Sequence, residues 1–217
     1  MSTVQAREQM IEQQVRAWDV LDARVLETLR KVPREAFVAP QHRFLAFADV
    51  EIPLPCGQHM LRPSVVGRLL QALALAGTER VLEVGTGSGF VTACLRTAGA
   101  SVRSLEIFPE VAELARANIS ALGLRDVEIV TQDASRLDTE TRYYDAIALT
   151  ASLPVPDERF QRQLAVGGRL FVVVGEPPVM EARLIRRISE DAWGVESLFE
   201  TVIDPLVHAT RPQGFVF

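Results

Sequence analysis

Three glycines, Gly85, Gly87 and Gly89, stand at alternate positions directly after a short apolar run. Glycine permits a positive φ in a tight turn, and it has no Cβ atom to keep a ligand away from the backbone. The residues from Val91 to Leu95 are then apolar at helical spacing, as in a helix that packs on a sheet. The segment predicts a strand, a glycine loop and a helix whose N-terminus can receive a flat or phosphate-sized ligand.

A second chemical signal is the acidic residue Glu106, which ends the next apolar segment about 20 residues beyond the glycines. A carboxylate at this place can accept hydrogen bonds from two ribose hydroxyls, so a ligand with a free 2′,3′-diol is expected. The alternative is a glycine turn that serves packing alone, with Glu106 merely solvated. The Gly-x-Gly-x-Gly spacing also differs from the Gly-x-Gly-x-x-Gly pattern of dinucleotide-binding proteins, and a glycine pattern is a weak signal by itself.

The elements that must position these groups alternate between strand and helix from Val81 to Val174. This alternation predicts the α/β class, with a Rossmann-like, doubly wound and mostly parallel sheet whose crossovers are right-handed. Two helices are expected in the first forty residues, the second capped by Asp22 and stopped by Pro33. Residues 182–189 and 195–203, around a turn at 191–194, predict a C-terminal β-hairpin.

The length of 217 residues and the hydrophobic content of 48% suit one domain with a sizeable core. We expect a single domain over 1–217, with N-terminal helices and a substrate loop in 1–64 and the Rossmann-like core in 65–217. Its formal net charge of −5 argues against binding to nucleic acid or to an anionic membrane surface. No leader or bilayer-spanning run is found, so a cytoplasmic location is expected.

Metal and disulfide chemistry are not indicated by the sequence. The two cysteines, Cys56 and Cys94, form no disulfide framework, and Cys94 is expected to be a buried apolar residue of a helix. The three histidines, His42, His59 and His208, do not have the spacing of metal ligands. No metal site is therefore expected.

Residues 82–89, Leu-Glu-Val-Gly-Thr-Gly-Ser-Gly, closely resemble the first motif of class I S-adenosylmethionine-dependent methyltransferases. Within that class they are most similar to the protein-L-isoaspartate O-methyltransferases. Val-Pro-Arg-Glu at 32–35, Tyr-Asp-Ala-Ile at 144–147 and Gly-Gly-Arg-Leu at 167–170 resemble other motifs of this family, in the family's order. The glycine pair at 167–168 is expected to form a loop ahead of a buried strand. The resemblance extends from about Met10 to Leu206.

The resemblance implies an enzyme that binds S-adenosyl-L-methionine and transfers its methyl group to the α-carboxylate of L-isoaspartyl residues in damaged proteins or peptides. The ester then collapses to a succinimide, whose hydrolysis returns some normal aspartate. A carboxylate is ionised at neutral pH, so the reaction needs no strong base. The cofactor contacts implied by the family motifs are Gln58, Gly85, Thr86, Gly87, Gly89, Glu106, Asp133 and Ala134. Asp133 stands where the class places an acceptor for the adenine amino group, although a plain loop or helix-capping aspartate is the alternative.

The loop before residue 64 departs from the family pattern Gly-Gln-Thr-Ile-Ser-x-Pro. Gln58 and Pro63 match, but His59 replaces the threonine and Leu61 replaces the serine, whose hydroxyl contacts the isoaspartyl carboxylate in the family. Leucine cannot donate a hydrogen bond, and losing such a donor can cost about 10²–10³ in rate. His59 is the candidate substitute, because imidazole can donate a hydrogen bond or act as a base. The alternative is a histidine at the surface of a loop.

Thr150 follows the fourth expected strand, where open α/β sheets bind ligands. It is expected to line the transfer site or to cap the next short helix. Near the end of the chain, Asp204, Pro205 and Leu206 resemble the family's closing Val-Pro-Leu.

Three hypotheses remain open from the sequence. The first is isoaspartate repair, with His59, Leu61 and Thr150 at the acceptor side. The second is methylation of a different carboxylate or a small molecule on the same scaffold. The third is cofactor binding without catalysis. The oligomeric state cannot be inferred from the sequence.

Overall fold

The computed structural model describes residues 2–137 and 143–211. Its helices are α1 (Thr3–Met10), α2 (Ala23–Lys31), α3 (Pro63–Leu73), α4 (Phe90–Thr97), α5 (Pro109–Ala121) and α6 (Glu158–Arg162). Its main strands are β3 (Arg80–Val84), β4 (Ser101–Glu106), β5 (Val127–Thr131), β6 (Tyr144–Leu153), β7 (Leu164–Glu176), β8 (Val179–Ser189) and β9 (Ala192–Glu200). Two short strands, β1 (Ile52–Pro53) and β2 (His59–Met60), pair with each other in a separate antiparallel ribbon.

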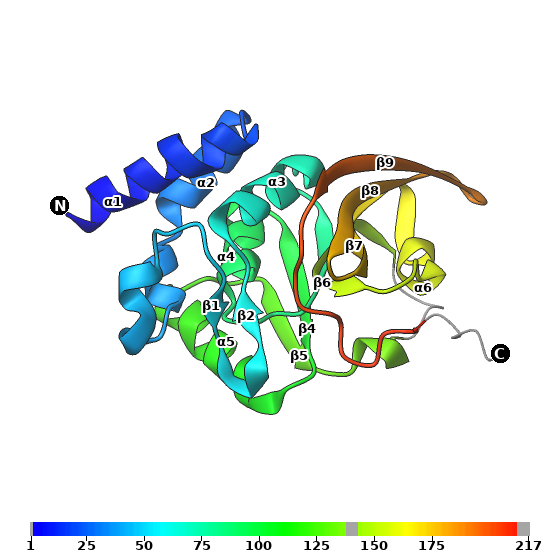
Figure 1. The fold of residues 1–217 in the computed structure, drawn as a ribbon. Coiled ribbons are helices and arrows are strands. Elements are labelled where there is room, and N and C mark those ends of the chain that lie inside the picture. Colours follow the sequence, from blue (N-terminus) through cyan, green and yellow to red (C-terminus); the bar gives the residue numbers. More distant parts are fainter. Residues whose placement is uncertain (1, 138–142, 212–217) are drawn as a thin grey trace.

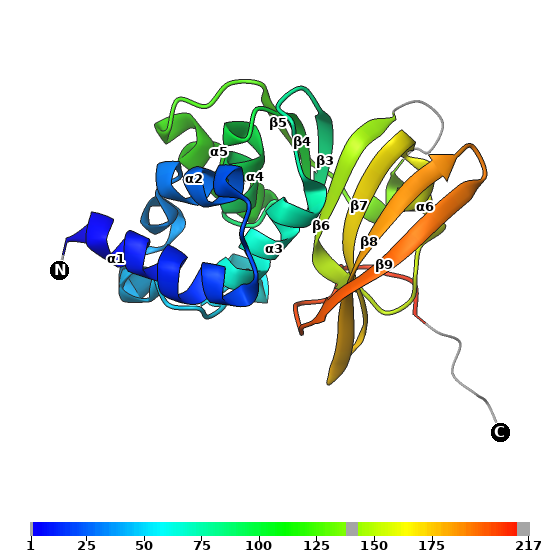
Figure 2. The same ribbon diagram turned by 90° about the horizontal axis from the view of Figure 1, so that it is seen from above.

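The main sheet has the order β5-β4-β3-β6-β7-β8-β9 (Figure 1). Neighbouring strands from β5 to β7 are parallel, whereas β8 and β9 continue the sheet as antiparallel strands. The expected Rossmann-like, mostly parallel α/β sheet with N-terminal helices and a C-terminal hairpin is confirmed. Figure 2 shows the N-terminal helices with α3, α4 and α5 on one side of the molecule and the long strands β7, β8 and β9 on the other.

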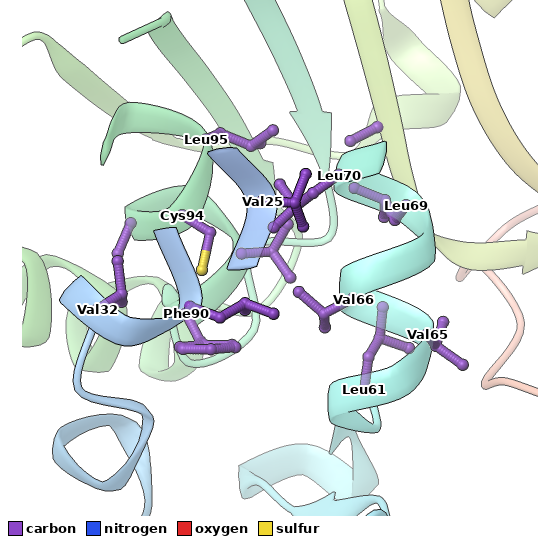
Figure 3. Packing of buried hydrophobic residues seen from close by; sticks show 14 of the residues in the cluster. Val25, Val32, Leu61, Val65, Val66, Leu69, Leu70, Phe90, Cys94 and Leu95 are labelled. Carbon is purple, nitrogen blue, oxygen red and sulfur yellow. The ribbon is translucent and has the colours of Figure 1, made fainter. Parts of the chain in front are cut away.

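Both faces of the sheet are buried. Side chains along a strand point alternately to opposite faces, so neighbouring residues belong to different clusters. Val81 and Leu82 are neighbours in β3 and both fully buried, yet they belong to different hydrophobic clusters. The larger cluster lies under α2, α3 and α4 (Figure 3). The smaller cluster contains Phe160 of α6 on the opposite face. Near-continuous apolar runs therefore specify the central strands, as expected for a parallel sheet covered on both sides.

The helix boundaries follow local capping chemistry. The Asp22 side chain accepts a hydrogen bond from the Arg24 amide and caps α2, as the sequence predicts. Pro63 occupies the first turn of α3, where its missing amide hydrogen costs nothing. None of the helices in residues 2–137 and 143–211 has the length and apolarity that crossing a bilayer requires.

Three expected boundaries were wrong. β6 continues to Leu153, so Thr150 lies inside a strand, and the cap of α6 is Asp157. β7 starts at Leu164, before the glycine pair that we expected to form a loop. A Cβ atom on Gly168 would lie 2.8 Å from the Ala165 carbonyl oxygen, beside a break in the register between β6 and β7, so the glycine serves an irregularity within the strand. The C-terminal hairpin turns at residues 190–191, because Ala192 already belongs to β9.

The sheet reverses its winding between β3 and β6. From β3 the chain proceeds outward to β4 and β5, and from β6 it proceeds the other way to β7. Loops leaving the carboxyl ends of β3 and β6 diverge, which opens a crevice at a topological switch point. The segment after β9 returns to this place, where Pro205 pairs with Ser152 of β6 (Figure 1).

Glu83 in β3 is a buried carboxyl group whose titration should be visible in the stability of the protein. It is fully buried, and its Oε2 atom accepts hydrogen bonds from the hydroxyls of Thr92 and Ser104. Burial raises the pKa of Glu83 to about 8, although the two hydroxyls lower it in part. The folded state therefore retains a proton that the unfolded chain loses near pH 4.5.

We expect this group to lower the free energy of unfolding as the pH rises from about 4.5 to about 8, with a limiting slope of about 1.4 kcal/mol per pH unit. Its stabilising contribution is fully present below pH 4.5 and lost above pH 8. Glu83→Gln removes the titration. In denaturant unfolding, the free energy of unfolding of the variant should therefore rise relative to that of the wild type between pH 5 and 9. Glu113→Gln, at an exposed site, is the control. An equal difference at both pH values would contradict the prediction.

Candidate cofactor and acceptor site

The glycine loop after β3 is anchored to the neighbouring strand. The amide of Gly85 donates to the carbonyl oxygen of Leu105 at 2.9 Å. Gly85 has a φ of +94°, a conformation that side chains rarely adopt, and a Cβ atom there would lie 2.5 Å from the Thr150 hydroxyl oxygen. The loop therefore runs so close to β6 that only glycine fits at this position.

Glu106 faces the same loop from the end of β4. Its Oε2 atom accepts a hydrogen bond from the Gly87 amide at 3.0 Å, and its Oε1 atom accepts one from the Phe108 amide at 3.1 Å. Only 5% of the residue is exposed. Burial raises the pKa of Glu106 above its ordinary value, whereas the amide hydrogen bonds lower it in part. Each carboxylate oxygen keeps a further lone pair, so the group can accept two hydroxyl hydrogens from a ligand.

These groups line a cleft of about 590 Å³, including its open mouth, at the switch point of the sheet. This size is typical of small-molecule sites. Of the residues expected to contact a cofactor, the cleft is lined by Gln58, Gly85, Gly87, Glu106, Asp133 and Ala134. Residues 204–207, which follow β9, close one side of it.

Asp133 follows β5 and has two partners. Its Oδ1 atom accepts from the Ser135 amide and caps the short 3-10 helix η6 (Ala134–Arg136), and its Oδ2 atom lies 2.8 Å from Nδ1 of His208. Burial acts to raise the pKa of Asp133, but the hydrogen bonds from His208 and Ser135 outweigh it and hold the pKa below its ordinary value. Asp133 therefore both caps a helix and presents an ionised carboxylate to the cleft.

Two of the expected cofactor contacts face elsewhere. The hydroxyl of Thr86 lies 2.6 Å from the hydroxyl of Ser104 in the buried network around Glu83, so only its backbone is free to meet a ligand in the cleft. A Cβ atom on Gly89 would contact Ala115 of α5 at 3.4 Å, so this glycine serves the close packing of two helices. Gly89, the third glycine of the motif, thus lets the start of α4 pack closely on α5 and does not contact the cleft.

A smaller cavity adjoins the cleft on the side of the residues before α3. It shares His59, Gly85, Gly87 and Thr150 with the cleft and is also lined by Arg34, Met60, Leu61 and Phe90. The Thr150 hydroxyl donates toward the carbonyl oxygens of Val84 and Gly85, at 3.0 and 2.5 Å. Its single hydrogen is therefore already engaged by the backbone, and Thr150 braces the glycine loop.

Leu61 is 8% exposed and belongs to the large hydrophobic cluster, next to Val65 of α3 (Figure 3). Its carbonyl oxygen accepts a hydrogen bond from Nη2 of Arg34 at 2.8 Å. The Arg34 guanidinium also donates to Ala46 and lies 4.9 Å from the centroid of the Phe90 ring. Burial lowers the pKa of Arg34 to about 10. This buried arginine fixes the loop that carries His59 and Leu61.

His59 is partly exposed, and its Nδ1 atom lies 2.8 Å from Oδ2 of Asp204. We did not foresee this pair, nor the roles of Arg34 and His208 at the site. Asp204 precedes the Pro-Leu dipeptide that resembles the family's closing motif, but no local feature of the sequence shows that it meets a residue 145 positions earlier. Within the described residues, no group of three His, Cys, Asp or Glu side chains is arranged to hold a metal ion.

The doubly wound sheet has the architecture of a class I S-adenosylmethionine-dependent methyltransferase, and the glycine loop at its switch point, with the carboxylates after β4 and β5, is the candidate cofactor site. The residues fit the cofactor, because Glu106 is preset as an acceptor for a ribose diol and Gly85 removes the Cβ atom that would crowd the loop.

The chain belongs to the protein-L-isoaspartate(D-aspartate) O-methyltransferase family, whose model matches residues 5–210. It is 39% identical to protein-L-isoaspartate O-methyltransferase 2 of Pelobacter propionicus, over 94% of this chain and 91% of that protein. It is 37% identical to the enzyme of Aeropyrum pernix, over 94% and 80% of the two chains. A solved Plasmodium falciparum structure of this kind, in complex with S-adenosyl-L-homocysteine, has a TM-score of 0.80 and 20% identity, and covers 92% of this chain and 97% of its own.

Proposed function

We propose that this protein transfers the methyl group of S-adenosylmethionine to the α-carboxylate of L-isoaspartyl residues in damaged proteins and peptides. The observation that carries the proposal is the acceptor-side cavity, which directly adjoins the cofactor cleft and shares Gly85, Thr150 and His59 with it, in a chain of this family. An acceptor in the smaller cavity and a cofactor in the cleft would meet at the shared wall. The cofactor, when bound, supplies an electrophilic methyl group.

The protein's own contribution is positioning. A carboxylate with an ordinary pKa is ionised at neutral pH, so no proton has to be removed before transfer. Glu106 and Asp133 would fix the ribose and adenine, and the glycine loop would fix the rest of the cofactor. The gain in rate would come from alignment at near-attack distance.

A polypeptide acceptor is favoured over a small molecule by an open groove that adjoins the cofactor cleft. The groove is lined by Gln58, by residues 204–209 and by the β7–β8 turn around Pro177, and it shares Gln58 and residues 204–207 with the cleft. Such a groove could contact residues of a polypeptide beside the one that is methylated. We further propose that residues 1–217 act as one unit, because the N-terminal part supplies Arg34, Gln58 and His59 to cavities that the core also lines. We propose a cytoplasmic location for this unit.

The test is methyl transfer from labelled S-adenosylmethionine to an isoaspartyl peptide and to its aspartyl twin. We expect labelling of the isoaspartyl peptide alone. Binding of S-adenosylhomocysteine is measured in parallel, so that a missing cofactor cannot be mistaken for a missing acceptor. Intact cofactor binding without transfer to the isoaspartyl peptide would refute the proposed substrate.

Leu61 supports a second candidate function, which is methylation of a different carboxylate or a small molecule. Its side chain is packed into the core and offers no donor to an acceptor. Transfer to other acceptors should therefore be assayed with the same protein. Leu61→Ser should be compared only after its stability is measured, because truncating a buried leucine costs about 2–5 kcal/mol.

A further inference from the structure

One polar pair at the cofactor cleft joins distant parts of the chain. His59 lies in β2, and Asp204 lies in the segment that pairs with the end of β6. Their Nδ1 and Oδ2 atoms are 2.8 Å apart. His59 lines both the cofactor cleft and the smaller cavity. Both members of the pair thus line the cofactor cleft, and His59 also lines the smaller cavity.

Asp204 is held in place by backbone hydrogen bonds between its segment and β6. The Ser152 amide donates to the Asp204 carbonyl oxygen at 2.8 Å, and the Leu206 amide donates to the Ser152 carbonyl oxygen at 2.8 Å. These hydrogen bonds tie the segment to β6, which carries Thr150 two residues earlier. Asp204 therefore fixes the orientation of the His59 ring relative to the main sheet, in addition to what the residues around His59 contribute.

The pairing leaves Nε2 of His59 available. Nδ1 is engaged by Asp204, and no other described residue is hydrogen-bonded to the ring. A neutral imidazole that donates from Nδ1 can only accept at Nε2, whereas an imidazolium donates at both nitrogens. The charge state of His59 therefore decides whether this wall can bind a carboxylate.

The uncharged side chains near this wall cannot take that role. The Thr150 hydroxyl already donates to backbone carbonyl oxygens, and Leu61 has no donor. The amide nitrogen of Gln58 donates to the Cys56 carbonyl oxygen at 3.3 Å. At the wall shared by the two cavities, His59 is thus the side chain that can offer a charged donor, whereas Arg34 can offer one only inside the smaller cavity, from its unpartnered Nη1 atom.

His59 stands among charged groups from several elements. Asp204 faces it from the segment after β9, and Glu51, the residue before β1, interacts through charge with His59, Asp204 and Arg62. Burial and the charge of Asp204 raise the pKa of Glu51, while Arg62 and His59 lower it. A protonated imidazole would offset the charge of Asp204 and leave this wall able to accept a further carboxylate.

We propose that His59, oriented by Asp204, binds the acceptor carboxylate through a protonated Nε2–H and so replaces the donor that Leu61 lacks. His59 is the substrate-binding residue in this arrangement, and Asp204 is a positioning residue. The inference rests on the proposed function, because it assumes an acceptor that is anionic before methyl transfer. Because only the imidazolium donates from both ring nitrogens, we expect transfer to be faster at the acidic end of the pH range tested.

The experiment measures kcat and KM for the isoaspartyl peptide from pH 5.5 to 9 in the wild type, His59→Gln, Asp204→Asn and His42→Gln. The wild-type kcat/KM should be higher at pH 5.5 than at pH 9, because only the imidazolium donates from both ring nitrogens. His59→Gln should lower kcat/KM about 10- to 100-fold at pH 6, mainly through KM, and flatten the profile, as for a lost hydrogen bond to a charged group. His42→Gln, outside both cavities, should match the wild type.

Asp204→Asn should move the profile toward lower pH, because the imidazolium loses its carboxylate partner, and Asp204→Glu should restore part of the wild-type profile. A merely structural role for Asp204 would lower activity equally at every pH. Thermal unfolding of each variant shows whether it is folded.

Two results would overturn the inference while leaving the proposed function intact. One is transfer by the wild type that His59→Gln does not change. The other is a rate that rises with pH and loses this rise in His59→Gln, which would make His59 a base for an acceptor that must lose a proton. Absence of transfer to the isoaspartyl peptide at every pH, with S-adenosylhomocysteine bound, would instead overturn the proposed function and the inference with it.

Discussion

Gly85→Ala should destabilise the fold and weaken cofactor binding together. The new Cβ atom would lie 2.5 Å from the Thr150 hydroxyl oxygen, and the residue would keep a φ of +94°. A left-handed conformation costs an alanine about 1–2 kcal/mol, and an overpacked contact costs about 1–3 kcal/mol more. We therefore expect the free energy of unfolding to fall by about 2–5 kcal/mol in denaturant titration. The affinity for S-adenosylhomocysteine should fall about 10- to 100-fold in calorimetry, because the displaced loop carries the Gly87 amide.

Gly123→Ala separates backbone strain from the steric contact. Gly123 follows α5 with a φ of +65°, and a Cβ atom there has no neighbour within 4 Å. This control should lose only about 1–2 kcal/mol and leave cofactor binding unchanged. Combining Gly85→Ala with Thr150→Ala removes the obstructing hydroxyl and should return part of the loss, measured against Thr150→Ala alone. If Gly85→Ala behaved like Gly123→Ala, the close approach of the loop to β6 would not be the reason for this glycine.

The central part of the fold could be predicted from the sequence because its signals are local. The central parallel strands β3 and β6 are buried on both faces and therefore read as apolar runs, and each is followed by a glycine or proline that marks the turn. Glu106 could be placed for the same reason, since it ends a strand at a fixed distance from the glycine loop. Its hydrogen bonds to Gly87 and Phe108 follow from that position.

Features that depend on distant pairings could not be predicted. β6 extends to Leu153 because β7 and the segment at Pro205 pair with its last residues, which nothing within the sequence of β6 reveals. The contact between His59 and Asp204 has the same origin. Arg34 was part of a recognised motif, yet its burial and its hydrogen bonds to Ala46 and Leu61 emerge only from tertiary packing.

For Leu61, the sequence showed the chemistry of the side chain but not its packing. Its chemistry was clear from the sequence, because leucine offers no hydrogen-bond donor in any environment. Its packing against α3 was not, so a leucine that replaces a polar residue was seen as a loss alone. In the structure it is also a gain in buried apolar area, which ties the acceptor-side loop to the core.

Glu106→Ala should raise the dissociation constant of S-adenosylhomocysteine about 100- to 1,000-fold, because each hydrogen bond between a ligand and a charged group contributes about 1.5–3 kcal/mol. The substitution also leaves the amides of Gly87 and Phe108 without their acceptor in a buried place. Glu106→Gln keeps the shape and one acceptor oxygen, so its loss should be intermediate. Calorimetric titration measures the affinities, and Glu113→Gln, whose side chain is 75% exposed, is the matched control.

A ligand that lacks the ribose 2′-hydroxyl shows whether the loss comes from the diol. The wild type should bind this ligand about 10- to 100-fold more weakly than S-adenosylhomocysteine, as for one lost hydrogen bond to a carboxylate. Glu106→Ala should bind the two ligands almost equally, because the partner of the hydroxyl is already gone. A full penalty for the missing hydroxyl in Glu106→Ala would mean that another group binds the ribose. Glu106 would then act only through the glycine loop, by holding the Gly87 amide in place.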